Sequence, residues 1–122
     1  MRERIRDKGR LEHILTAIDN LLEGSKRHTM EEAAADNIIF YGFVKQVEII
    51  GEATYKLTTE FREAHPETPW NKMEGMRHVL VHDYFMISPA KVWLVINNDL
   101  PALRPQIERY IAEESALQKS EE

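Results

Sequence analysis

The sequence contains no cysteine, which excludes disulfide bonds and thiolate metal ligands. It also lacks any apolar run long enough to span a bilayer. The first ten residues are charged and have no apolar segment of the kind found in secretory signals. These absences together predict a protein of the reducing cytoplasm that has no contact with a membrane.

Basic residues are outnumbered by acidic ones, with 16 Lys and Arg against 21 Asp and Glu and a net charge of −5. This balance argues against broad, charge-driven binding of nucleic acid, although it leaves room for a local basic cleft. Five basic residues lie within the first ten positions, and a solvated helix start explains them as well as a binding surface does: Arg2, Arg4, Arg6, Lys8 and Arg10.

The length of 122 residues fits one compact domain, and the sequence shows no internal repeat. We expect a single helical domain over residues 1–114, followed by a polar, disordered tail over 115–122. Apolar residues recur at helical spacing near the N-terminus, and Gly24 is well placed to end that helix. Thr29 and Glu32 form a capping-box pattern that predicts the start of a short helix.

A central stretch between Asn37 and His65 contains no proline and carries the most sustained apolar seam of the chain. The seam residues are Phe40, Phe43, Val47, Ile50, Leu57 and Phe61. Further apolar residues widen this surface, so a helix here could pack on its own domain and on a second copy. A core helix contacted on several sides explains the same pattern equally well.

Three proline-containing segments predict where the remaining helices begin and bend. Thr68–Pro69 and Ser88–Pro89 each resemble an N-cap followed by proline, and the first should open a helix that reaches about His82. Asn97–Asp99 and Pro101 should break or bend the last helix. No segment alternates as a strand does. We therefore expect an all-α protein, an up-down bundle of about four to five helices.

Polar residues interrupt an apolar segment at one place, from Arg77 to Tyr84. Histidine exchanges protons near neutral pH, and His78 and His82 lie here beside other polar side chains. The remaining histidines, His13, His28 and His65, are scattered, and we expect them at the surface.

Helix geometry constrains this polar group. Positions five apart, such as Arg77 and His82, differ by about 140° around a straight helix. The two side chains can still contact one substrate if the long arginine side chain extends around the helix or if the helix ends near His82. They can also do so if two copies of the chain each contribute residues at a dimer axis.

Three interpretations of the group remain open on residue types alone. A histidine can remove the proton of a ribose 2′-OH while arginine binds the adjacent phosphate, which would give metal-independent RNA cleavage. His78 and His82 have a common zinc-ligand spacing, but no third ligand is evident. The third interpretation is structural, with Arg77 paired to Asp83 and the histidines capping a helix end.

Arg77-x4-His82-x-Tyr84 resembles the R-x4-H-x-Y motif of the HepT-like family, the DUF86 branch of the HEPN superfamily. Other segments of the chain are also similar to that family in the same order, from about Arg6 to Ile111: Glu48–Ala53 ("E-x-I-G-E-A"), Pro69–Trp70 ("P-W"), Trp93 and Asp99–Pro101 ("W…D-L-P").

This resemblance implies a homodimeric, all-helical ribonuclease in which the R-x4-H motifs face a shared cleft. It implies Arg77 and His82 as catalytic residues, with no metal and no cofactor, and RNA as the substrate. It also implies a partner, an MntA-type nucleotidyltransferase antitoxin that transfers AMP from ATP to Tyr84. Adenylyl groups there would add bulk and negative charge beside the phosphate-binding arginine.

The chain departs from many relatives of the wider superfamily by having His78 where they have asparagine. We expect His78, Asp83 and Glu52 to support the site, and Glu48 shares a helix face with Glu52. Gly51 beside Glu52 suggests a close helix contact. Two alternatives stay open: a non-catalytic RNA- or nucleotide-binding partner subunit of a nucleotidyltransferase, and a helical dimerisation unit whose polar motif fixes register.

Overall fold

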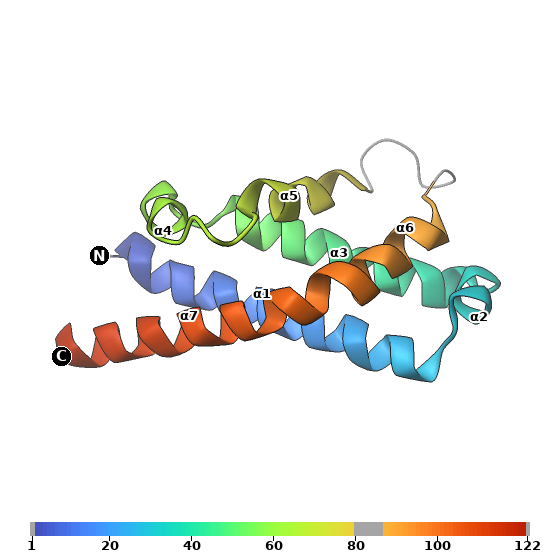
Figure 1. The fold of residues 1–122 in the computed structure, drawn as a ribbon, viewed down its shortest axis with the longest axis horizontal. Helices are drawn as coiled ribbons and strands as arrows, with labels where there is room; N and C mark the ends of the chain where they lie inside the picture. Colours follow the sequence, from blue (N-terminus) through green and yellow to red (C-terminus); the bar gives the residue numbers. More distant parts are fainter. Residues whose placement is uncertain (1, 80–86, 122) are drawn as a thin grey trace.

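The computed structural model describes residues 2–79 and 87–121, and all regular secondary structure in that part of the chain is helical, as predicted. Its long helices are α1 (Arg2–Arg27), α3 (Asn37–Tyr55) and α7 (Leu100–Glu121). α1 packs against both α3 and α7, and these three helices run lengthwise through the molecule (Figure 1). Within the described ranges there is no strand, which confirms the expected all-α helical bundle.

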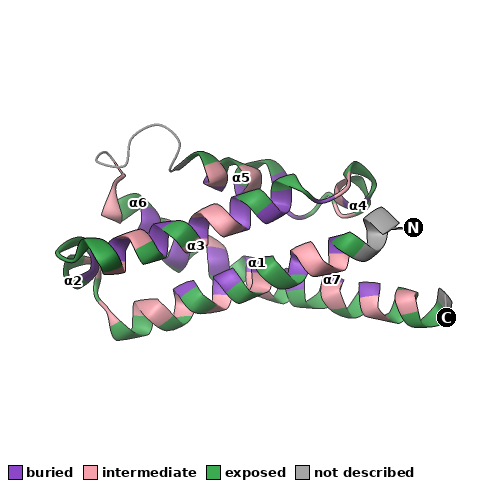
Figure 2. Ribbon diagram, turned by 180° about the vertical axis from the view of Figure 1, so that it is seen from behind, coloured by how far each residue is buried: buried purple, intermediate pink, exposed green. Residues whose placement is uncertain are grey.

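The apolar seam of the central stretch is buried, but it is divided between two helices. All six seam residues are buried, including Leu57 and Phe61 beyond the end of α3. α4 (Thr59–Ala64) starts afresh, with Thr58 as its N-cap. Asp7 of α1 is buried and accepts hydrogen bonds from both Thr58 N (2.8 Å) and Thr58 Oγ1 (2.7 Å). The buried faces of the helices are turned toward one another (Figure 2).

Two helix starts predicted from local patterns are confirmed. Thr29 and Glu32 form the capping box of α2 (Met30–Ala34). Ser88 caps α6 (Pro89–Leu94), with proline in its first turn. The helix end predicted at Gly24 is wrong, because α1 continues to Arg27. A Cβ at Gly24 would lie 3.0 Å from Cζ of Phe43, so this glycine makes room for an aromatic ring of α3.

The helix predicted after Thr68–Pro69 differs in its start and its form. α5 (Trp70–Gly75) has Pro69 as its N-cap and no side-chain cap hydrogen bond. The Thr68 hydroxyl donates instead to Gln106 Oε1 (2.5 Å) and lies 2.6 Å from the Tyr110 hydroxyl. From Met76 the chain tightens into a 3₁₀ turn, η1 (Met76–Val79). The predicted helix end near His82 lies outside the described residues.

The irregularity predicted around Asn97–Pro101 is a π-helical turn, η3 (Val95–Asp99), between α6 and α7. α7 then runs on past Pro101 and Pro105 without a break. Residues 115–121, expected as a disordered tail, lie in the last turns of α7. No helix in residues 2–79 and 87–121 has the length and apolar character needed to cross a membrane.

Candidate functional site

The backbone of Arg77 lies directly against α3 at Gly51. η1 packs on α3, and a Cβ placed on Gly51 would lie 2.8 Å from both Cα and Cβ of Arg77 and closer still to its amide nitrogen. Atoms this close to a Cβ leave no room for any side chain larger than hydrogen. The close contact predicted from Gly51 is therefore confirmed, and its partner is the arginine of the polar motif.

The Arg77 guanidinium lies over an exposed aromatic ring. Its Cζ is 3.7 Å from the centroid of the Tyr55 ring, one turn beyond Gly51 on α3. Stacking of this kind attracts a guanidinium and fixes its plane. Nε of Arg77 is buried without a hydrogen-bond partner, and no carboxylate of the described residues pairs with the side chain. Within residues 2–79 and 87–121, the guanidinium therefore has donors that no carboxylate occupies.

The structure places some of the other predicted site residues near Arg77. His78 follows it on η1 and is exposed. Glu52 is exposed on α3, and its carboxylate makes no hydrogen bond or ion pair with another described residue. Glu48 pairs with Lys45, with Nζ 2.8 Å from Oε1. His82, Asp83 and Tyr84 lie outside the described residues.

His65, expected at the surface, is instead part of an aromatic cluster. Its ring centroid is 4.4 Å from that of Phe61 and 4.3 Å from that of Tyr110. Its Nδ1 lies 2.9 Å from the Phe61 carbonyl oxygen, and its Nε2 lies 3.4 Å from Glu113. Burial raises the pKa of the Tyr110 phenol, which donates to Glu67 at 2.8 Å. These contacts join α4 to α7 and indicate a packing role for His65.

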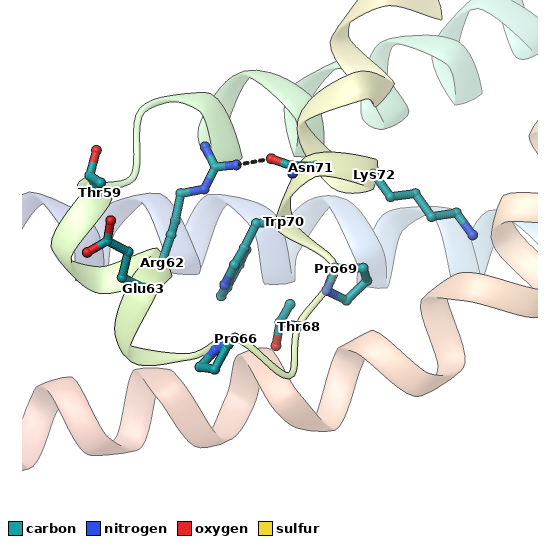
Figure 3. A pocket seen from close by; sticks show the side chains of 9 residues that line it. All are labelled: Thr59, Arg62, Glu63, Pro66, Thr68, Pro69, Trp70, Asn71 and Lys72. Atoms are coloured by element: carbon teal, nitrogen blue, oxygen red, sulfur yellow. Dashed lines mark hydrogen bonds between the residues drawn. The ribbon is translucent and has the colours of Figure 1, made fainter.

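A pocket of about 540 Å³ lies beside this cluster, between α4 and α5 (Figure 3). Its cations are already paired: Arg62 binds Glu74 (2.6 Å) and Asn71 (3.0 Å), and Lys72 binds Asp99 (2.8 Å). Trp70 is 5% exposed, and its indole N–H donates to the His65 carbonyl. The Pro69–Trp70 segment therefore anchors the core, and this pocket offers no unpaired cation to a phosphate.

The acidic and imidazole side chains of the described residues are scattered over the helices. In residues 2–79 and 87–121, no three His, Cys, Asp or Glu side chains are grouped so that they could hold a metal ion. The described residues of the polar motif, Arg77 and His78, belong to no such group.

Comparisons with known proteins identify a family that matches most of the chain. The family model "Ribonuclease HepT-like" matches residues 14–110. A "Putative RNase" of Caldanaerobacter subterraneus subsp. tengcongensis is 38% identical over 104 residues, which cover 85% of this chain and 93% of the relative. A "Probable ribonuclease HepT" of Thermococcus cleftensis is 32% identical over 102 residues, covering 84% and 93%. No solved structure matches significantly.

The family match spans most of the chain and includes α3, α5 and η1, the elements that hold Arg77. The relatives are matched over almost their whole lengths. The chain therefore belongs to the HepT-like ribonuclease family.

Proposed function

We propose that the protein is a toxin-type, metal-independent endoribonuclease that cleaves RNA with Arg77 and His82. The observation that carries this proposal is the Arg77 guanidinium, which is held over Tyr55 and whose buried Nε has no hydrogen-bond partner among the described residues. A planar guanidinium with free donors binds a phosphodiester through two parallel hydrogen bonds. Membership of a ribonuclease family supports RNA as the source of that phosphodiester.

In the proposed reaction, neutral His82 removes the proton of a ribose 2′-OH. The 2′-oxygen attacks the adjacent phosphorus, the bond from phosphorus to the 5′-oxygen breaks, and a protonated histidine gives its proton to that leaving oxygen. The products are a 2′,3′-cyclic phosphate and a 5′-hydroxyl. Arg77 stabilises the charge on the non-bridging oxygens. A homodimer cleft would supply the second histidine, as His82 of the partner subunit.

The first test is cleavage of single-stranded RNA by the purified protein in EDTA, with the products identified by mass spectrometry. We expect fragments that end in a 2′,3′-cyclic phosphate, because the 2′-oxygen is the nucleophile. The matched control is the same RNA with every 2′-OH methylated, which should stay intact. Tight binding without products would favour the non-catalytic RNA-binding alternative, and a requirement for Mg²⁺ would contradict the metal-independent mechanism.

The proposal includes control of the nuclease by a partner nucleotidyltransferase that adenylylates Tyr84. An adenylyl group brings a phosphate and a bulky nucleoside close in sequence to Arg77 and His82, which should repel RNA. Intact-mass measurement after incubation with that partner and ATP should show a gain of AMP-sized increments. Tyr84→Phe should lose the gain, whereas Tyr41→Phe should keep it. An unchanged gain in Tyr84→Phe would place the modification elsewhere.

A further inference from the structure

A second polar pocket, of about 230 Å³, lies between α1 and α3. Apart from Ile49 and Ala53, its lining is charged or polar: Arg10, His13, Lys45, Glu48, Glu52 and Lys56. We refer to it as the α1–α3 pocket. The sequence placed Arg10 only within a basic N-terminal stretch, because nothing local links it to residues on α3.

The cations of the α1–α3 pocket are largely unpaired, unlike those of the pocket in Figure 3. Arg10, His13 and Lys56 form no ion pair with a carboxylate of the described residues. Nε of Arg10 is buried and has no hydrogen-bond partner in the part of the chain that the structure describes. Leaving a buried N–H unpaired is costly, so an anion that accepts from this guanidinium would be favoured there.

The α1–α3 pocket is next to the candidate site. Gly51 and Tyr55, which contact Arg77, are each followed directly by a residue of the pocket, Glu52 and Lys56. Adjacent residues of a helix point about 100° apart, so the two sets lie on neighbouring faces of α3. α3 packs against η1 and against α1 (Figure 1). An extended anion that crosses α3 from Arg77 would therefore reach Arg10 and Lys56.

We propose that the α1–α3 pocket binds a second phosphodiester of the single-stranded RNA whose cleaved phosphate is held by Arg77. The inference rests on the proposed function for the identity of the anion. Arg10 and a ring N–H of His13 would donate to the phosphate oxygens from α1, and Lys56 would add positive charge from the end of α3. The Glu52 carboxylate also lines the pocket and repels anions. This repulsion lowers the affinity of the pocket for small anions and favours an RNA strand that is already held at Arg77.

The test measures binding of a single-stranded RNA with every 2′-OH methylated, by fluorescence anisotropy over a series of salt concentrations. Each phosphate contact on a single strand contributes about 0.7 to the slope of log affinity against log salt. We expect Arg10→Gln to weaken binding by about tenfold at low salt. It should also lower the slope by about 0.7.

A second variant guards against an effect of Arg10 on folding. His13 and Lys56 are exposed, so replacing both with Gln should leave the unfolding temperature unchanged while weakening binding by about two- to fivefold. Lys26→Gln is the matched control, because it removes an exposed charge from the far end of α1 and should bind as the unchanged protein does. Glu52→Gln should have the opposite effect and tighten binding.

Normal affinity and slope in Arg10→Gln and in the His13/Lys56 double variant would overturn the inference, as would weaker binding by Glu52→Gln. No binding by the unchanged protein would overturn it as well. The methylated RNA cannot be cleaved, so the binding measurement tests the second phosphate site independently of the proposed nuclease activity. If unmodified RNA is bound but never cleaved, the proposed nuclease fails and the subsite stands. If RNA is cleaved and the pocket variants bind normally, the subsite alone fails.

Discussion

Arg77→Lys should lower the rate of RNA cleavage by about 10²–10³-fold while leaving the fold intact. Lysine keeps the positive charge, but it loses the planar fork that can grip two phosphate oxygens at once. It also stacks less well on the Tyr55 ring, over which Cζ of Arg77 lies at 3.7 Å. The measurement is the single-turnover cleavage rate in EDTA, with the unfolding temperature recorded for each variant.

Arg109→Lys is the matched control for this substitution. Arg109 also stacks on a tyrosine, with its Cζ 5.1 Å from the Tyr110 ring centroid, but it is exposed and paired with Glu67 and Glu113. Surface changes of this kind alter the free energy of unfolding by no more than about 0.5 kcal/mol. Arg109 is also outside the candidate site, so we expect Arg109→Lys to leave the cleavage rate unchanged. A rate for Arg77→Lys within threefold of the unchanged protein would show that the guanidinium fork takes no part in catalysis.

Gly51→Ala should destabilise the protein and slow cleavage together. The new methyl group would overlap the backbone of Arg77, so η1 must move away from α3. Overpacking of this kind costs about 1–3 kcal/mol of unfolding free energy. For a chain of this length we expect the unfolding temperature to fall by roughly 4–12 °C. Displacing Arg77 by about 1 Å should also lower the cleavage rate by about 10²-fold.

Gly42→Ala provides a control of opposite sign on the same helix. A Cβ at Gly42 meets nothing within 4 Å, and the residue is exposed. Alanine is the better helix former, so this variant should gain about 0.5–1 kcal/mol of stability and cleave RNA normally. Thermal unfolding followed by circular dichroism distinguishes the two. If Gly51→Ala unfolded at the same temperature as Gly42→Ala, the close contact with Arg77 would be wrong.

The start of a helix could be predicted from the sequence where the capping side chain bonds to a backbone amide a few residues further along the chain. Thr29 and Ser88 each bond to a backbone amide three residues on, so the pattern contains everything the cap needs. Thr68 has the same local pattern, but its hydroxyl bonds to Gln106 and Tyr110 of α7. Tertiary contacts made by residues far along the chain therefore decided the start of α5.

In the candidate site too, features encoded by neighbouring residues could be predicted, whereas contacts between distant residues could not. The motif identified Arg77, and Gly51 indicated a close helix contact, because both signals lie in the residue types themselves. Tyr55 gave no such signal, since an exposed tyrosine on a helix is ordinary until an arginine is placed over its ring. Helix periodicity also could not show that the segment tightens into a 3₁₀ turn at Met76.

The π-helical turn η3 has a consequence for every residue that follows it. A π turn closes i→i+5 hydrogen bonds and so accommodates one more residue than an α-helical path. One residue corresponds to about 100° of rotation in an α-helix. The turn therefore sets the angular phase of α7 and directs Leu103, Ile107 and Tyr110 into the core. α6, the segment Val95–Asp99 and α7 follow one another without a gap, and this segment sets the rotation of α7 relative to α6.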